Sequence, residues 1–253
     1  MFNKAIVRVP GQSMIEGLTT AGLGKPDYEK ALIQHREYRD ALEACGLDVL
    51  VLREDEQYPD AVFVEDVALL TRDCAIITNP GALPRRGEIV DIKNVLRDDF
   101  DTFEEVCDPG TVEAGDIMMV GTHFYIGLSG RTNEVGAGQV ISYLEKHGMS
   151  GSVVKVDEVL HLKTGVSYLE HNNLLACGEF LLKEEFKNFN ILEIADDESY
   201  AANCIWVNDT VLIPKGYPKA RKTIEGAGYR IREIDVSEFR KIDGGLSCLS
   251  LRY

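Results

Sequence analysis

The sequence has no run of apolar residues close to the roughly 18–20 that a membrane-spanning helix needs. Its first segment, MFNKAIVRVPGQ, lacks the continuous apolar core of a secretory signal peptide. No stretch rich in Pro, Gly and Ser marks a linker between domains. We therefore expect one cytoplasmic domain over residues 1–253, with no membrane partner.

Basic residues are few in number. The chain has 27 Lys and Arg against 42 Asp and Glu, which gives a formal net charge of −15. A surface of this sign repels phosphate backbones and anionic lipid headgroups. We therefore expect no nucleic-acid partner. The acidic excess favours a small cationic ligand instead.

Closely spaced cysteine pairs are also missing. The six cysteines are scattered and form no C-x-x-C motif: Cys45, Cys74, Cys107, Cys177, Cys204 and Cys248. This spacing disfavours a zinc site, and a chain of this length does not need disulfides to fold. We expect no metal, and we expect five of the six thiols to behave as small buried apolar groups.

A repeated pattern is the main positive signal. Two short apolar strands around a polar turn predict hairpins at 67–78, 117–127, 166–177 and 204–214. Predicted helices follow them, near 87–100, 132–147, 179–188 and 217–227. Each helix is followed by a brief strand, FEEVC, SVVKV, NILEI or YRIREI. A fifth helix, 27–45, precedes the strand LDVLVL but has no hairpin before it.

The two ends of the chain can supply the missing hairpin, if the N-terminal KAIVRV pairs with the C-terminal SCLSLRY. Five units then close into a ring, which hides the sheet edges. We predict an α/β fold built as a five-bladed propeller of ββαβ units with pseudo-fivefold symmetry. The alternative is two doubly wound α/β halves, which predicts parallel crossovers and leaves the hairpins unexplained.

Polar residues precede the predicted hairpins at equivalent positions of the units. They are Asp60, Glu65 and Asp66 in YPDAVFVED, Glu113 and Asp116 in GTVEAGD, His161 in LHLKTG, and Asp243 and Cys248 in KIDGGLSC. In a ring of equivalent units these positions converge at one end. A thiol, an imidazole and several carboxylates together suggest a nucleophile, a proton shuttle and a clamp for a cation.

Each of these residues also has a structural interpretation. Cys248 alone would be one more core thiol, but Gly244–Gly245 before it allow a close approach of backbone or ligand. His161 lies between leucines and is compatible with a half-buried structural histidine. The pair Glu65–Asp66 is harder to explain structurally because it interrupts an apolar run.

Arg85 and Arg131 lie at predicted helix starts, where they are expected to be solvated. Basic side chains at a helix N-terminus oppose the helix dipole. A carboxylate ligand at these two positions would relieve that unfavourable placement.

Eight ordered segments resemble those of the dimethylarginine dimethylaminohydrolase family: VRVPGQS, GLTT, LGKPDY, YPDAVFVED, PGTVEAGDIM, IGLSGRTN, LHLKTG and KIDGGLSCLSLRY. The resemblance extends over essentially the whole chain. It implies the five-bladed propeller of the guanidine-modifying superfamily. It also implies hydrolysis of Nω-methylated and Nω,Nω-dimethylated L-arginine to L-citrulline plus methylamine or dimethylamine, and a homodimer.

The resemblance also implies roles for the residues of the matching motifs. Cys248 is the nucleophile that forms an S-alkylthiouronium intermediate, His161 is the acid/base, and Glu113 is catalytic. The substrate contacts that it implies are Asp66 and Glu113 to the guanidinium, with Glu65 beside them. It further implies that Asp60 and the carbonyls of Leu18 and Ile242 contact the α-ammonium, and that Arg85 and Arg131 contact the α-carboxylate. The Gly-rich segment around Leu18 is a candidate mobile lid. No cofactor is required by this chemistry.

Other members of the superfamily are alternatives. Arginine deiminase has the same implied roles but carries an added helical module, for which this chain leaves no room. Agmatine deiminase and the amidinotransferases are further same-fold enzymes, and the two arginines favour a substrate with an α-carboxylate over agmatine. A non-catalytic binding ring, like the ribosome anti-association factor of this fold, does not need Cys248, His161 and Glu113 together.

Overall fold

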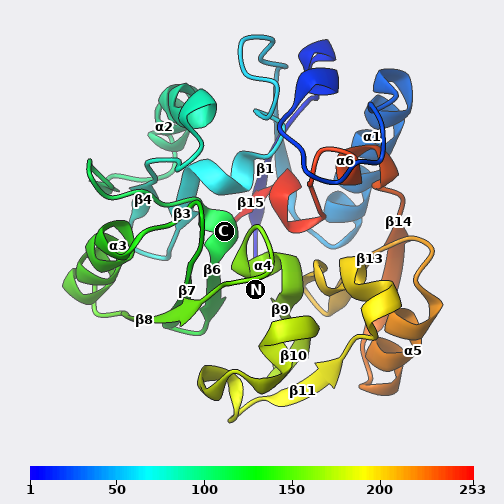
Figure 1. Cartoon of the computed structure of the whole chain (residues 1–253). Helices are drawn as coiled ribbons and strands as arrows, with labels where there is room; N and C mark the ends of the chain where they lie inside the picture. Colours follow the sequence, from blue (N-terminus) through cyan, green and yellow to red (C-terminus); the bar gives the residue numbers. More distant parts are fainter. The chain divides into compact units, whose positions relative to one another are not determined.

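A computed structural model describes all of residues 1–253 (Figure 1). Contacts within it divide the chain into two compact units, one of residues 1–63 and 165–253, the other of residues 64–164. The prediction of one domain over the whole chain stays a prediction. None of the helices combines the length and the apolar character that crossing a bilayer requires.

The larger unit contains three three-stranded sheets. Their strands are β15 (Leu251–Arg252), β1 (Lys4–Arg8) and β2 (Asp48–Leu52); β9 (Val166–Tyr168), β10 (Asn173–Ala176) and β11 (Asn190–Glu193); and β12 (Ile205–Val207), β13 (Thr210–Pro214) and β14 (Arg230–Ile234). Its α-helices are α1 (Tyr28–Ala44), α5 (Pro218–Gly226) and α6 (Ser237–Arg240). Its 3-10 helices are η1 (Gln12–Glu16), η5 (Gly178–Leu182), η6 (Glu184–Phe186), η7 (Asp196–Ala202) and η8 (Ser247–Leu249).

The smaller unit contains the other two sheets. Their strands are β3 (Ala68–Leu70), β4 (Ala75–Ile77) and β5 (Phe103–Glu105), and β6 (Ile117–Val120), β7 (His123–Leu128) and β8 (Ser150–Lys155). The helices are α2 (Ile89–Leu96), α3 (Glu134–Lys146), and the 3-10 helices η2 (Val64–Val67), η3 (Leu83–Glu88) and η4 (Ala114–Asp116). The short helix α4 (Leu162–Gly165) begins at the end of this unit.

All five sheets follow one plan, an antiparallel strand pair with a third strand added in parallel. The four predicted hairpins are confirmed. The predicted pairing of the chain ends is also confirmed, because β1 is antiparallel to β15 and parallel to β2. Five small mixed sheets exclude the alternative of two doubly wound halves.

One predicted helix is wrong. Residues 179–188 form no α-helix but the two 3-10 turns η5 and η6. Phe180 and Phe186 are both fully buried, and a spacing of six residues places two side chains on different faces of an α-helix. Two short turns bring both rings inward instead, with their centroids 6.4 Å apart.

The cysteine expectation was only partly right. Cys74, Cys177 and Cys204 are buried, whereas Cys107 is exposed and Cys45, like Cys248, is partly exposed. Cys107 lies two residues beyond the end of β5.

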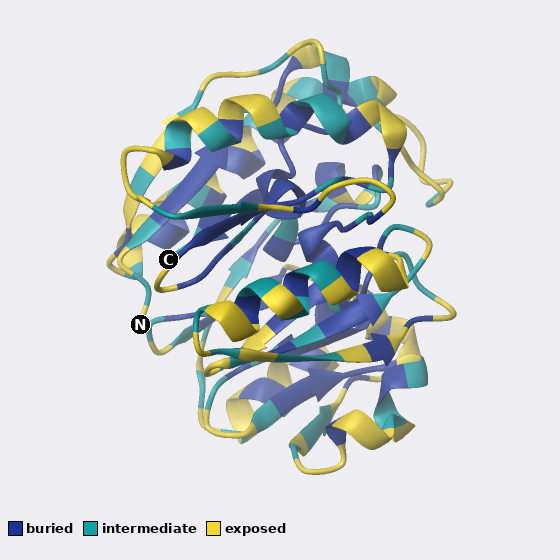
Figure 2. Cartoon of the chain, turned by 90° about the vertical axis from the view of Figure 1, so that its left-hand side faces the viewer, coloured by how far each residue is buried: buried dark blue, intermediate teal, exposed yellow.

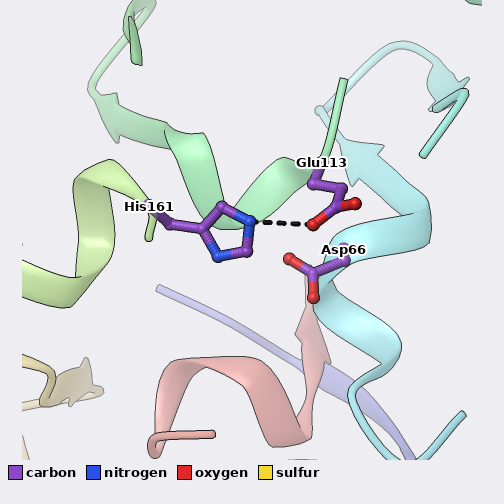
Figure 3. Close-up of side chains that lie close together, drawn as sticks. All are labelled: Asp66, Glu113 and His161. Atoms are coloured by element: carbon purple, nitrogen blue, oxygen red, sulfur yellow. Dashed lines mark hydrogen bonds and ion pairs between the residues drawn. The ribbon is translucent and has the colours of Figure 1, made fainter. Parts of the chain in front are cut away.

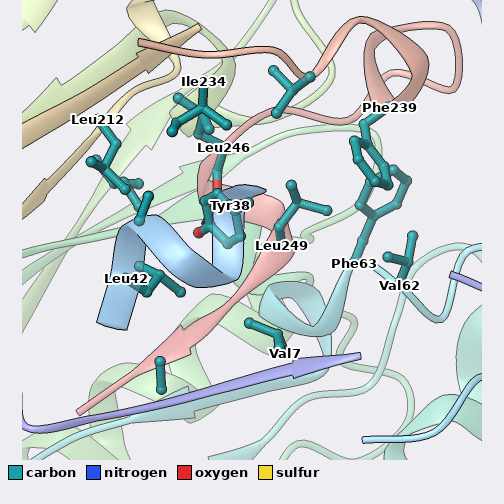
Figure 4. Close-up of a cluster of buried hydrophobic side chains, with 14 of the residues drawn as sticks. Val7, Tyr38, Leu42, Val62, Phe63, Leu212, Ile234, Phe239, Leu246 and Leu249 are labelled. Carbon is teal, nitrogen blue, oxygen red and sulfur yellow. Dashed lines mark hydrogen bonds between the residues drawn. The ribbon is translucent and has the colours of Figure 1, made fainter. Parts of the chain in front are cut away.

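The core of the larger unit fixes the C-terminal segment (Figure 4). Tyr38 of α1 is fully buried, and its hydroxyl lies 2.8 Å from the carbonyl oxygen of Leu246 and 2.7 Å from Oγ of Ser250. In Figure 2 the helices expose one face; buried residues concentrate in the antiparallel strand pairs, such as β3 with β4, whereas the third strands, such as β2 and β8, are mostly partly or fully exposed. Packing and buried hydrogen bonds therefore hold both sides of the short helix η8.

Candidate active site

An imidazole ring and two carboxylates come together in the unit of residues 64–164 (Figure 3). Asp66 lies on η2, Glu113 directly precedes η4, and His161 directly precedes α4. Nε2 of His161 is 2.9 Å from Oε2 of Glu113, and polar atoms of all three side chains lie within 4.8 Å of one another. All three are buried, so water screens their charges poorly.

Gly115 makes this close approach possible. A Cβ atom at this position would lie 2.7 Å from Oδ1 of Asp66 and 2.8 Å from Nδ1 of His161. The backbone N–H of Gly115 also donates to Oδ1 of Asp66 over 3.0 Å. Sequence analysis missed this role; the glycine between Glu113 and Asp116 in the EAGD motif was the available signal.

Arg85 is buried, which contradicts the expectation of a solvated helix-start residue. Its Nη1 lies 2.5 Å from Oδ2 of Asp66, and its Nη2 lies 2.8 Å from Oε2 of Glu88. Burial alone would raise the pKa of Asp66, but the Arg85 guanidinium and His161 lower it below its ordinary value. Sequence analysis missed Glu88. The predicted contact of Arg85 with an α-carboxylate stays a prediction.

The remaining predicted charged residues of this unit, Glu65, Glu113 and Arg131, also have partners within the protein. Glu65, next to Asp66 on η2, has its Oε1 2.6 Å from Nζ of Lys163. Oε1 of Glu113 accepts from the N–H of Ala82 over 2.8 Å and lies 3.8 Å from Nη1 of Arg131. The adjacent carboxylates Glu65 and Asp66 therefore each have their own cation, Lys163 for Glu65 and Arg85 for Asp66. Sequence analysis missed Lys163, two residues beyond His161.

The surroundings of His161 favour its charged form. Burial alone would lower its pKa, but the hydrogen bond to Glu113 and the charges of Asp66, Asp116 and Glu113 outweigh burial and raise the pKa to about 9. The ring is therefore an imidazolium at neutral pH and holds a proton beside two carboxylates.

This proton makes stability depend on pH. A folded-state pKa of about 9 against an ordinary 6.5 stabilises the fold fully below pH 6.5, and this contribution is lost as pH rises through about 9. We expect the gap in unfolding free energy between wild type and Glu113→Gln to be largest below pH 6.5 and to shrink toward pH 9. Chemical denaturation at several pH values measures it. A difference in unfolding free energy that does not change with pH would contradict the raised pKa of His161 in the folded protein.

The same three side chains offer donor atoms that could hold a metal ion. Asp66, however, already faces the Arg85 guanidinium, and Glu113 faces the His161 ring. A divalent metal ion at this point would be repelled by the Arg85 guanidinium and would have to displace a proton from the His161 imidazolium. The donor set fits a planar organic cation with several N–H groups better than a metal.

Cys248 lies on η8 of the other unit and is partly exposed. The backbone N–H of Gly245 lies 3.4 Å from its Sγ. Asn203 holds the preceding residue from two sides, because its Oδ1 accepts from the N–H of Ser247 and its Nδ2 donates to Oγ of Ser247, both over 3.0 Å. A Cβ atom at Gly245 would lie 2.5 Å from the Asn203 side chain, which explains one glycine of the GGLSC motif. Sequence analysis missed Asn203.

Three predicted substrate contacts of this unit lie together. The N–H of Leu18 donates to Oδ1 of Asp60 over 3.1 Å. A Cβ atom at Gly17 would lie 3.1 Å from Oδ1 of Asp60 and 3.3 Å from Cγ2 of Ile242. The threonines after Leu18 bond to the carbonyl of Lys241 and to the Asp243 carboxylate. The candidate lid is thus joined to the segment that leads to Cys248.

Comparison with known proteins adds to this geometry. Residues 24–210 match the family model described as N,N dimethylarginine dimethylhydrolase, eukaryotic. The chain belongs to this dimethylarginine hydrolase family. The resemblance of the motifs is thereby confirmed.

Relatives of the dimethylarginine hydrolase family cover the whole chain. The N(G),N(G)-dimethylarginine dimethylaminohydrolase of Pseudomonas aeruginosa is 59% identical over 100% of both chains. The protein of the same name from Streptomyces coelicolor is 33% identical over 98% of this chain and 96% of its own.

Solved structures agree with this family membership. The Pseudomonas aeruginosa enzyme, in a cysteine-to-serine variant complexed with citrulline, matches with a TM-score of 0.99 over 100% of both chains at 59% identity. The N-terminal domain of a cyanobacterial arginine dihydrolase, at 19% identity, covers 100% of this chain and 97% of its own with a TM-score of 0.88. The second likeness shows the fold alone.

Proposed function

We propose that the chain hydrolyses Nω-methylated and Nω,Nω-dimethylated L-arginine to L-citrulline and methylamine or dimethylamine. The buried imidazolium between two carboxylates, in a chain of this family, carries the proposal. Two solved structures support it: a complex of the Pseudomonas enzyme with citrulline, and a histidine-to-glycine dimethylarginine dimethylaminohydrolase as an adduct with S-methyl-L-thiocitrulline.

The chemistry explains why these residue types are needed. A guanidinium carbon is a poor electrophile because its charge is delocalised over three nitrogens. In our proposal Asp66 and Glu113 hold guanidinium N–H groups, and the Cys248 thiolate attacks Cζ. The bond from Sγ to Cζ forms while the bond from Cζ to the alkylated nitrogen breaks, which gives an S-alkylthiouronium on Cys248.

His161 serves both half-reactions in this proposal. Its proton passes to the departing amine, and the neutral ring then takes a proton from the attacking water. Water oxygen bonds to Cζ, the bond to Sγ breaks, and citrulline leaves. When the substrate guanidinium binds Glu113 and Asp66 in this proposal, its positive charge offsets theirs. The pKa of His161 then falls from about 9 toward neutral, because the two carboxylates stabilise the imidazolium less.

The remaining predicted residues orient the amino-acid end of the substrate in our proposal. Asp60 and the carbonyls of Leu18 and Ile242 bind the α-ammonium, and Arg85 and Arg131 bind the α-carboxylate. Glu65, next to Asp66 in sequence, stays a predicted contact beside the guanidinium. The grouping of the first three residues supports their shared role.

We also propose that the five sheets are the blades of one closed propeller domain over 1–253. The common plan of the sheets and the match of the whole chain to a solved relative support this. Homodimerisation, the absence of a cofactor and a cytoplasmic location stay predictions.

A citrulline assay with four substrates tests the proposed function. We expect kcat/KM to be higher for dimethylarginine and monomethylarginine than for arginine, and lowest for agmatine, which lacks the carboxylate. Arg131→Ala should raise KM for dimethylarginine by about tenfold while turnover persists. A preference for arginine or agmatine, with dimethylarginine unreacted, would overturn the substrate assignment.

A further inference from the structure

Asp116 is a buried carboxylate to which neither the family resemblance nor the proposed mechanism gives a role. It lies on η4, three residues after Glu113, and its exposed fraction is 0%. Its Oδ1 accepts from the N–H of Leu162 over 2.9 Å. Its Oδ2 accepts from the hydroxyls of Ser129 and Thr132, each over 2.7 Å.

The directions of these hydrogen bonds follow from the proton inventory. Oγ of Ser129 already accepts from the N–H of Arg131 over 3.0 Å, and Oγ1 of Thr132 accepts from the N–H of Glu113 over 3.2 Å. Each hydroxyl has one proton, which points at Asp116. Both carboxylate oxygens therefore act as acceptors, as an ionised carboxylate requires.

The three donors connect Asp116 to three different site residues. Leu162 is the neighbour of His161 in sequence, Thr132 holds the backbone of Glu113, and Ser129 holds the backbone of Arg131. Gly127 of β7 leaves room for this arrangement, because a Cβ atom there would lie 2.8 Å from Oδ1 of Asp116. One buried carboxylate thus joins three separate segments of the chain.

We infer that Asp116 is a positioning residue that holds His161, Glu113 and Arg131 in the arrangement that the reaction needs. This inference rests on the proposed function for its kinetic consequence, but the arrangement itself is a property of the unliganded protein. Asp116 does not act on the substrate; it acts through Leu162, Thr132 and Ser129.

The charge of Asp116 acts in the same direction as its geometry. It is one of the negative groups, with Glu113 and Asp66, that favour the imidazolium form of His161, while Arg85 offsets part of the charge of Asp66. Burial raises the pKa of Asp116 itself, and His161 and the three donors oppose that effect. Loss of this carboxylate charge should lower the pKa of His161.

Asp116→Asn tests the inference because it keeps the shape but places an NH₂ group among donors. We expect kcat to fall by about 10- to 100-fold, as small misplacements of catalytic groups do. We also expect the pKa of His161, followed by NMR with ring-labelled histidine, to fall by about one unit. Asp101→Asn, at an exposed aspartate of the same unit, should change neither quantity.

The two readouts separate this inference from the proposed function. If the wild-type protein does not hydrolyse dimethylarginine, the NMR titration of His161 still tests Asp116. An Asp116→Asn protein that is folded and shows wild-type values of kcat and of the His161 pKa would overturn the inference. If Asp116→Asn does not fold, Thr132→Val replaces it in the test. We expect kcat to fall in Thr132→Val and to recover in Thr132→Ser, because serine keeps the hydroxyl that joins Asp116 to the backbone of Glu113. Equal values of kcat in these two variants would overturn the inference.

Discussion

Cys248→Ser is expected to fold like the wild-type protein and to lose at least about 10³-fold in citrulline formation from dimethylarginine. A serine hydroxyl is far less ionised than a thiol near neutral pH, so the attack on Cζ loses its nucleophile. Cys248 is accessible to a ligand because its side chain is only partly buried. Thermal unfolding and circular dichroism check the fold, and the colour assay for citrulline checks the rate.

Two other thiols provide matched controls for this substitution. Burial raises the pKa of Cys177 to about 11 and that of Cys204 to about 12, so both are protonated and inert at neutral pH. Cys177→Ser and Cys204→Ser should lower the melting temperature and keep turnover per folded molecule. Loss of turnover in a folded Cys177→Ser protein, or its persistence in Cys248→Ser, would contradict the assignment.

The repeated units could be predicted because their signals are local. Alternation of apolar residues around a polar turn specifies a hairpin whatever surrounds it, and β6 with β7 illustrates this. The pairing of β1 with β15 was predicted because one of the five units lacked a hairpin, and no local sequence signal indicated it. The prediction of a helix over residues 179–188 was wrong because burial of both Phe180 and Phe186 outweighed the helical character of the segment.

The candidate site was predictable only where a residue type itself suggests chemistry. Cys248, His161 and the acidic residues were candidates for that reason. Glu88, Lys163 and Asn203 were missed because each acts on another protein group, and the sequence does not show which groups meet. The burial of Arg85 was missed for the same reason. Its charge is neutralised by Asp66, which is distant in sequence, and by Glu88, which is close in sequence.

Removal of the His161 imidazole should affect the two half-reactions differently. His161→Gly is expected to reduce steady-state turnover of dimethylarginine by about 10²–10⁴-fold, the usual contribution of a general acid–base group. S-methyl-L-thiocitrulline should still react once, because its methanethiolate leaving group needs less help from a proton donor than dimethylamine does. His171→Gly, at an exposed turn residue with φ of +53°, is a matched control that should retain turnover.

Mass spectrometry distinguishes the two jobs of His161. With S-methyl-L-thiocitrulline, we expect His161→Gly to accumulate an adduct on the peptide that contains Cys248, because no group activates the water that would hydrolyse it. Dimethylarginine, if it reacts at all, must give the same adduct mass, since only the leaving group differs. Rapid release of citrulline from this variant would exclude His161 as the base. An adduct on Cys107 instead, the exposed thiol of the unit that contains His161, would exclude Cys248 as the nucleophile.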